Sequence, residues 1–296
     1  MFQRHDANKG GYKRDRLTKL DIQDFQRVFS LFSLQTYEKR LFKMTKIDCL
    51  SYIKKSKSNI QQNFIEEDYL SDLLSAACLL IEDGLEISFS HRSFQEYFVA
   101  LHISNAQPII QEKLIERYWK NIDSDEVMKL LLELNPDLVE RLLIIPQLEK
   151  LFNDLGVKKQ IGITHTAKYF KLSFSEINVD IEADRLSATI TNTSDNQYIS
   201  SIVHMAIAHC ETYTFPNKSY FKKHTDNMYD KYGVVGEKKV YKTDQMSYKT
   251  PILETLLKSK GIFSVAYLKA AFTAYKILKE KHENSLQNID ELLGIV

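Results

Sequence analysis

With 296 residues, of which 44% are hydrophobic, the chain is long enough for one large or two medium-sized domains with a real core. Its formal net charge of +1 gives no bulk attraction for a polyanionic partner. Nine glycines and five prolines are too few for an all-β chain of tight turns, so the composition favours helices.

Cysteine usage and hydropathy predict the compartment. Cys49, Cys78 and Cys210 are far apart and form no C-x-x-C pair, which is typical of a reducing cytoplasm. The polar N-terminus lacks the apolar core of a signal peptide. No apolar run approaches the roughly 18 residues of a membrane span. We therefore predict a cytoplasmic protein with no membrane partner.

The first third of the chain predicts three helices. Residues 1–19 are basic, and we interpret them as a solvated loop. Thr18 and Asp21 are candidate caps for a first helix with an apolar stripe. A second helix is expected at about 45–54 and a third at 66–80, with a loop between them at 54–63. The phosphate-binding pattern G-x-x-x-x-G-K-[ST] is absent from the chain.

A hairpin follows the third helix. Asp83-Gly84 lies between the apolar runs 79–81 and 85–89, which is a strong hairpin signal. Three helices and a hairpin are the order of a winged helix, a fold that often binds DNA. The helix before this wing is acidic and lacks Lys and Arg, whereas affinity for DNA depends on phosphate neutralisation. We therefore regard nucleic acid as an unlikely partner.

The rest of the chain predicts further helices and a small sheet. Short helices are expected at 109–119, 125–134, 136–145 and 147–155. Breaks are expected at Asn135-Pro136 and Ile145-Pro146, where each proline can open the next helix at its first turn. Beyond them we expect a hairpin around 169–193, a long loop at 215–249, and helices at 201–208, from Pro251 to Gly261, and at 264–282. The predicted fold is mainly α: a winged-helix domain (1–105), a helical extension (106–155) and a C-terminal α+β region (156–296).

No self-contained active site is apparent. His204 and His209 are five residues apart, which is about 140° around a helix, so their spacing does not favour a zinc site. Cys49 and Cys78 lie in apolar surroundings, and we interpret both as buried hydrophobes rather than nucleophiles. We predict no catalytic residue, no metal ligand and no enzymatic activity of the chain's own.

The stretch 87–103, ISFSHRSFQEYFVALHI, contains the candidate binding residue, His91. A short strand ends at His91, and Ser93 and Glu96 have the spacing of a capping box for the next helix. The apolar face of that helix comprises Phe94, Tyr97, Phe98 and Leu101. A helix N-terminus favours an anion. His91 is therefore either an anion ligand or a hydrogen-bonding cap of the strand–helix junction.

Residues 89–100, FSHRSFQEYFVA, resemble the segment that closes the nucleotide-binding module of NACHT-type STAND NTPases, the bacterial and animal NLR-like proteins. The family pattern is approximately F-x-H-x-S-F-Q-E-[FY]-x-A-A, and the chain departs from it at Val99. The N-terminal RHDANKGGYKRDRL also resembles the bacterial segment that leads out of the ATPase core. The resemblance covers residues 1–105. The matching positions are Phe89, His91, Ser93, Phe94, Gln95, Glu96, Tyr97 and Ala100.

The resemblance implies that residues 1–105 are a winged-helix domain and that His91 approaches the β-phosphate of bound ADP, holding the resting state closed. Walker A and Walker B segments are missing, so ADP or ATP would be bound with a NACHT ATPase domain, upstream or in trans, and no cofactor by this chain alone. We expect a fragment or a split gene that acts as the regulatory and sensor part, in antiphage defence. It would sense a protein ligand and oligomerise only with the ATPase core.

Two other interpretations stay open. In the first, the chain is a protein-interaction scaffold or a remnant with no nucleotide role, and His91 is only a cap. In the second, less favoured on its charges, the winged helix binds DNA.

Overall fold

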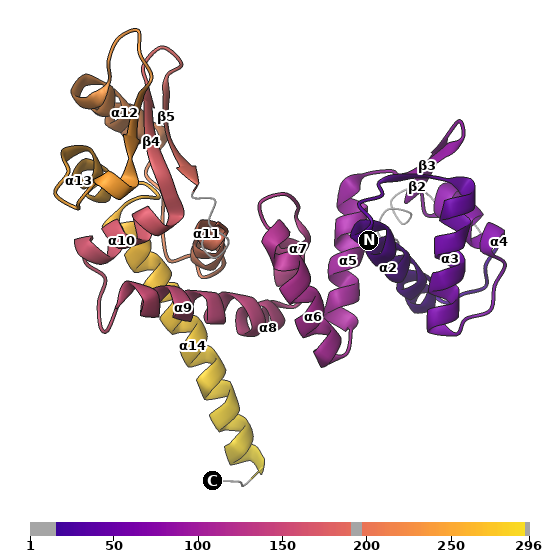
Figure 1. Cartoon of the computed structure of the whole chain (residues 1–296). Helices are drawn as coiled ribbons and strands as arrows, with labels where there is room; N and C mark the ends of the chain where they lie inside the picture. Colours follow the sequence, from indigo (N-terminus) through magenta and orange to yellow (C-terminus); the bar gives the residue numbers. More distant parts are fainter. Residues whose placement is uncertain (1–15, 191–196, 294–296) are drawn as a thin grey trace. The chain divides into compact units, whose positions relative to one another are not determined.

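The structure is a computed structural model, and it describes residues 16–190 and 197–293. The chain divides into two compact units, residues 1–138 and 139–296 (Figure 1). Helices form most of the described residues, and two three-stranded sheets contribute the strands. The prediction of a mainly α fold is therefore confirmed, whereas the predicted domain boundaries at 105 and 155 stay a prediction.

The first unit contains helices, two short helical turns of other types, and one sheet. Its elements are α2 (Ile22–Glu38), β1 (Lys43–Thr45), α3 (Lys46–Ile60), α4 (Glu66–Ser71), the π turn η1 (Asp72–Ala76), β2 (Leu80–Asp83), β3 (Glu86–Phe89), α5 (Arg92–Asn105), α6 (Pro108–Tyr118), the 3₁₀ turn η2 (Trp119–Asn121) and α7 (Val127–Leu134).

Side-chain caps start the first two helices. Asp21 accepts a hydrogen bond from the Asp24 N–H at 2.7 Å, and Thr45 caps α3. The loop predicted at 54–63 is wrong, because α3 continues to Ile60 and ends at Gln61 in the left-handed conformation. Lys54 and Lys55 are exposed there, and lysine is a good helix former.

The first sheet has the order β1-β3-β2 and is antiparallel throughout. The predicted hairpin is confirmed, with Gly84 at φ +63° in its turn. The third predicted helix is shorter than expected, because a π turn replaces its end. Helix, strand, helix, helix and two strands is the order that a winged helix requires, but the winged-helix assignment itself stays a prediction.

An aromatic core connects the sheet to α2 and α5. The rings of Phe29 and Phe98 meet edge to face with centroids 4.7 Å apart, and Phe32 and Phe89 are 5.8 Å apart. Such ring pairs add to the stabilisation that burial gives. The predicted apolar face of α5 is confirmed, since Phe98 is buried in this core and its neighbours on that face contact it.

A buried carboxylate fixes where the chain enters the first unit. Asp72 is 1% exposed and accepts hydrogen bonds from the Leu17 N–H at 2.7 Å and the Thr18 N–H at 2.9 Å. The Thr18 hydroxyl donates to it as well, at 2.5 Å. Thr18 therefore does not cap α2, as it was expected to, but binds η1.

The second unit combines a helical layer with the second sheet. Its elements are the π turn η3 (Glu140–Ile144), α9 (Ile145–Leu155), α10 (Ile163–Ser173), β4 (Phe174–Asp180), β5 (Arg185–Ile190), α11 (Ile199–His209), α12 (Lys218–Tyr232), β6 (Lys239–Lys242), the 3₁₀ turn η4 (Thr243–Gln245), α13 (Pro251–Leu257) and α14 (Val265–Leu293); a short helix, α8 (Pro136–Val139), contains the boundary between the units.

Pro146 lies in the first turn of α9, as predicted, but the break expected before it is absent. The π turn η3 runs directly into α9, and Pro146 occupies the first turn of α9. A proline in a helix lacks a donor and crowds the carbonyl four residues before it. The wider π turn before Pro146 relieves that crowding.

The second sheet has the order β5-β4-β6 and is antiparallel. The predicted hairpin is confirmed as β4 and β5, although residues 169–173 belong to α10 and residues 191–193 lie outside the described part. The long loop predicted at 215–249 is wrong, because α12 and β6 occupy most of it. Asn217 caps α12, and the Tyr241 hydroxyl donates to the Tyr232 carbonyl at 2.8 Å, which joins β6 to that helix.

Helix α14 lines the helical layer of this unit. The ring of Phe152 in α9 lies edge to face with Phe272, centroids 4.9 Å apart, and 5.5 Å from that of Tyr275. The predicted amphipathic helix is confirmed, and it extends beyond residue 282. Among the described helices, none is both long enough and apolar enough to cross a bilayer.

Gly233, which ends α12, has no room for a side chain. A Cβ atom there would overlap Ile181 Cδ1 and lie 2.7 Å from Ile181 Cγ1 and 2.8 Å from the Tyr229 carbonyl oxygen. Because the oxygen belongs to the backbone, the clash would not be relieved by a rotamer change of Ile181 alone. We expect Gly233→Ala to lower the free energy of unfolding by about 1–3 kcal/mol, measured by chemical denaturation of the chain.

Gly261→Ala is the matched control, because the nearest atom to its added Cβ would be Ser259 Oγ at 3.6 Å, an ordinary contact. Equal stability of the two variants would show that the second unit adjusts to a Cβ at Gly233.

Candidate functional site

His91, the sequence-predicted ligand residue, is the N-cap of α5. Its Nδ1 atom accepts a hydrogen bond from the Ser93 N–H at 3.1 Å and lies 2.6 Å from Ser93 Oγ. The predicted capping box is wrong. Ser93 lies inside the helix, and Glu96 pairs with Arg92 Nε at 2.9 Å rather than reaching back to the cap.

The capping bond determines which nitrogen of His91 carries the proton. A backbone N–H is only a donor, so Nδ1 must accept, and in a neutral imidazole the proton is then on Nε2. The His91 side chain is exposed, so this Nε2–H remains a donor for a ligand. The two interpretations of His91 are therefore compatible, because the cap and an anion contact use different nitrogens.

Two other residues of the motif bind within the protein. Gln95 is 5% exposed and donates to Thr36 Oγ1 and to the Leu41 carbonyl, both at 3.0 Å, which ties α5 to the end of α2. Glu96 is also buried; burial raises its pKa, although Arg92 opposes the shift. Sequence analysis assigned neither of these roles, because the partners of Gln95 lie more than 50 positions away.

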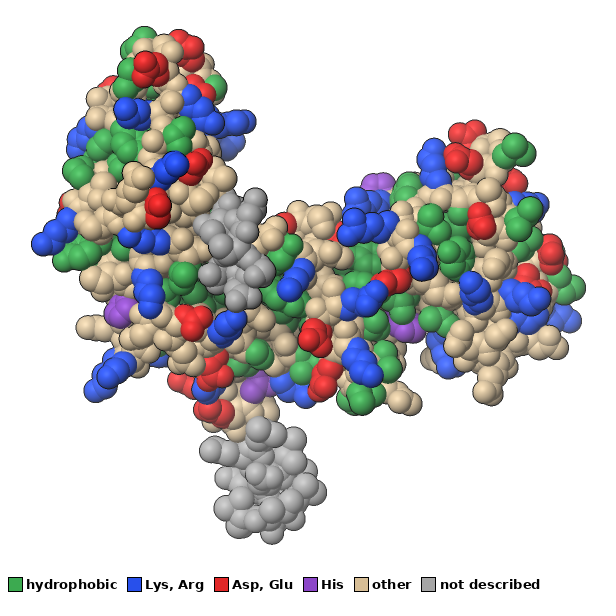
Figure 2. Space-filling model, viewed as in Figure 1, with side chains coloured by type: hydrophobic (Ala, Val, Ile, Leu, Met, Phe, Trp, Pro, Cys, Tyr) green, Lys and Arg blue, Asp and Glu red, His purple; other side chains and the backbone are tan. Residues whose placement is uncertain are grey.

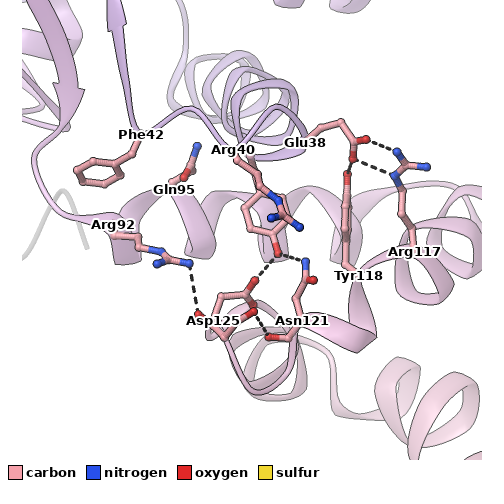
Figure 3. Close-up of a pocket in the computed structure, with 11 residues that line it drawn as sticks. Glu38, Arg40, Phe42, Arg92, Gln95, Arg117, Tyr118, Asn121 and Asp125 are labelled. Carbon is pink, nitrogen blue, oxygen red and sulfur yellow. Dashed lines mark hydrogen bonds and ion pairs between the residues drawn. The ribbon is translucent and has the colours of Figure 1, made fainter. Parts of the chain in front are cut away.

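A cleft of about 780 Å³ opens between the end of α2, the start of α5 and the turn between α6 and α7 (Figure 3). Polar and charged side chains form most of its wall. Its lining comprises Tyr37, Glu38, Arg40, Phe42, Arg92, Gln95, Arg117, Tyr118, Asn121, Ser124 and Asp125. We name it the arginine cleft.

Both acids of the arginine cleft are paired. Arg117 binds Glu38 with two nitrogens, with Nε 2.9 Å from Oε2, and the Tyr118 hydroxyl donates to the same oxygen at 2.6 Å. These hydrogen bonds, with that of Arg117 first, lower the pKa of Glu38 to about 2. Asp125 is buried and accepts from the Tyr37 hydroxyl and from the Val127 N–H. Glu38 is therefore neutralised by an arginine, whereas Asp125 is held by uncharged donors.

The cleft retains an unpaired guanidinium. Arg92 bonds Glu96 and donates through Nη2 to the Ser124 carbonyl at 3.3 Å. Within residues 16–190 and 197–293, the Arg40 side chain makes no hydrogen bond or ion pair. Nothing in the local sequence pattern indicates that Arg40 and Arg92 share a cleft, so sequence analysis missed it.

A second polar cluster, in the other unit, is centred on Glu140. This residue is 1% exposed, and its Oε1 accepts from His209 Nε2 at 2.8 Å. Its Oε2 accepts from His282 Nε2 at 2.8 Å, and Lys281 binds both oxygens. Burial by itself would raise the pKa of Glu140, but hydrogen bonds from Lys281, His209 and His282 outweigh it and lower that pKa.

The histidines of HMAIAHC have separate partners, in agreement with their spacing. His209 donates to Glu140, whereas His204 Nδ1 lies 2.9 Å from the Tyr267 hydroxyl. Lys281 places an ammonium group on the same carboxylate, where a metal ion would have to displace it. The geometry of Glu140 is that of an internal cross-link.

The thiols have no sign of activation. Burial raises the pKa of Cys49 to about 12 and that of Cys210 to about 11. Cys78 is exposed, so its interpretation as a buried hydrophobe is wrong. The regular helix ends before it, and its φ of +53° turns it away from the apolar face.

We expect Glu140→Ala to lower the free energy of unfolding by about 1–3 kcal/mol, because Lys281 and two imidazoles lose their buried acceptor but are themselves partly exposed to water. The native pKa of Glu140 is depressed, so its contribution is present above the unfolded-state pKa and is lost as pH falls through the native pKa. The wild type should therefore lose more stability than the variant between neutral pH and acid, as measured by denaturation at several pH values.

Glu149→Ala is the control, because Glu149 also pairs with a lysine of α14, Lys279 at 2.8 Å, but its side chain is 45% exposed. An exposed pair contributes about 1 kcal/mol or less. Equal losses from the two substitutions would contradict the cross-link.

Comparison with known proteins places the larger part of the chain in one family. The family model described as Short NACHT-associated C-Terminal domain, family 13 (SNaCT13), matches residues 134–293. No curated protein and no solved structure gives a significant match. The matched region contains the Glu140 cluster and the whole second sheet. Since more than half of the chain is matched, the predicted relationship to the C-terminal portion of a NACHT-type protein is confirmed, and the chain belongs to the SNaCT13 family of NACHT-associated C-terminal domains.

Proposed function

We propose that this chain is the regulatory part of a NACHT-type STAND NTPase, with His91 as the residue that reports the nucleotide state. Membership of a NACHT-associated family gives it a role within a NACHT-type protein. The observation that carries the finer proposal is the exposed Nε2–H of His91 at the N-terminus of α5. A phosphate oxygen is the acceptor that such a donor and such a helix end favour.

The attachment of α5 would transmit a phosphate contact at His91 to other elements of the first unit. Gln95 fixes α5 to the end of α2, and Phe98 places it in the aromatic core. A β-phosphate held at His91 would therefore restrain α2 and α5 together. Most of the contacts to ADP or ATP would come from a NACHT ATPase domain, upstream or in trans, and this chain would have no catalytic residue of its own.

The remaining roles follow from this placement. Residues 156–296 would sense a protein ligand, and oligomerisation would require the ATPase core. A cytoplasmic role in antiphage defence is the biological context that we propose. In Figure 2 acidic and basic side chains alternate over the face shown, without a continuous basic surface on the first unit there. DNA binding is accordingly the weakest candidate.

A protein-interaction scaffold is the second candidate function. It is favoured by the packing roles of Gln95, Glu96 and Phe98, which explain most of the motif without a ligand. In this case only the Nδ1 cap of His91 would matter.

Two substitutions at His91 separate the candidates. Asparagine is a good N-cap, so His91→Asn keeps the cap but removes the Nε2–H donor, whereas His91→Ala removes both. If His91 holds a phosphate, both variants should release ADP about tenfold faster, the loss of one hydrogen bond to a charged group. The measurement is the dissociation rate of fluorescent ADP from this chain joined to its NACHT ATPase domain.

If His91 is only a cap, His91→Asn should release ADP at the wild-type rate and His91→Ala should lower the melting temperature. That pattern would reject the switch and support the scaffold.

A further inference from the structure

We infer that the arginine cleft binds a small organic phosphate, with the phosphate held by Arg40 and Arg92 and the organic part against Phe42. This site is separate from the nucleotide contact proposed for His91, which does not line the cleft. It lies wholly within the first unit, so it needs no other domain.

One guanidinium of the lining is left for an anion. Arg117 pairs with Glu38 and Arg92 with Glu96, whereas the Arg40 side chain has no carboxylate partner among the described residues. Figure 3 shows the Arg40 side chain in the middle of the cleft, with Arg92 and Arg117 on either side in that view. A guanidinium matches the geometry of a phosphate, to which it gives two parallel hydrogen bonds.

The backbone conformation of Arg40 is energetically unfavourable for any residue other than glycine. Arg40 follows the C-cap of α2 at φ +55°, and the Leu41 N–H donates to the Thr36 carbonyl at 2.9 Å, which is the pattern that closes many helices. Glycine is the usual residue at this left-handed position. An arginine there is less stable than glycine would be, yet its side chain has no partner in the described protein.

Arg92 is held ready for a ligand. Its Nε atom bonds Glu96 and its Nη2 atom bonds the Ser124 carbonyl, so its guanidinium is fixed at the wall. These bonds leave donor capacity on Nη1, since a guanidinium has five N–H groups. A phosphate between a fixed Arg92 and a free Arg40 would order only one long side chain on binding.

The size of the cleft favours a small molecule over an ion or a peptide. A volume of about 780 Å³ exceeds what a single inorganic ion fills and lies within the range of small-ligand sites. Phe42 gives the wall an aromatic surface, and its ring is supported by Phe89, with centroids 6.0 Å apart. Peptides more often extend along a sheet edge or a groove.

Phenyl phosphate combines the two expected features and is the probe. We expect isothermal titration of the 296-residue chain to show binding of phenyl phosphate, weaker binding of inorganic phosphate, and no binding of phenol. Arg40→Gln should weaken phenyl phosphate binding at least about tenfold, the effect of a charge-assisted hydrogen bond.

Arg40→Gly separates a binding role of Arg40 from a structural role, because the two roles predict opposite changes in stability. It should lose affinity like Arg40→Gln while raising the melting temperature, because glycine relieves the left-handed backbone. Lys113→Gln, an exposed residue of α6 outside the cleft, is the matched charge control and should bind as the wild type does.

Three results would overturn the inference. The first is absence of phenyl phosphate binding. The second is equal weakening by Lys113→Gln and Arg40→Gln, which would mean diffuse surface attraction. The third is tighter binding of an acetylated triglutamate peptide than of phenyl phosphate, which would assign the cleft to acidic peptides. None of these results depends on the ATPase domain, so they leave the proposal for His91 unaffected.

Discussion

Removing a carboxylate from water costs several kcal/mol unless hydrogen bonds satisfy its oxygens, and each unit of this chain contains one such group at the first residue of a π turn. Asp72 is satisfied by the chain entering α2, and Glu140 by α11 and α14. The partners lie 54 to 142 residues away along the chain. Each buried acid is therefore satisfied only when distant segments of its unit come together.

The helix α5 shows how a compact motif divides structural and functional roles. Gln95 and Glu96 satisfy polar groups in the interior, and Phe98 fills the aromatic core. In the proposed function His91 would combine both roles, with Nδ1 in the cap and Nε2 exposed to a ligand. Packing explains most of the motif, and at His91 only Nε2 remains for a ligand. The proposed phosphate contact would then depend on an exposed donor held by a well-packed helix.

Arg40 lies where stability and binding conflict. A glycine at its left-handed position would be favoured by the backbone, and the arginine gains nothing from a described partner. Strained residues of this kind occur disproportionately at sites that bind ligands. Its side chain is exposed and lines the same cleft as that of Arg92, so a dissolved anion can reach both guanidinium groups.

The helices with a clear apolar stripe, the Asp83-Gly84 hairpin, the inward face of α5 and the relationship to NACHT-type proteins could all be predicted from the sequence, because each depends on the spacing of a few neighbouring residues. Other features became visible only in the folded chain: the residue that caps α5, the formation of α12 and β6 by the Lys- and Tyr-rich stretch, the exposure of Cys78, and the partners of Asp72 and Glu140. The arginine cleft belongs to the same class. Local periodicity specifies which face is buried, whereas the partner of a polar group comes from a distant segment, and no local pattern records that pairing.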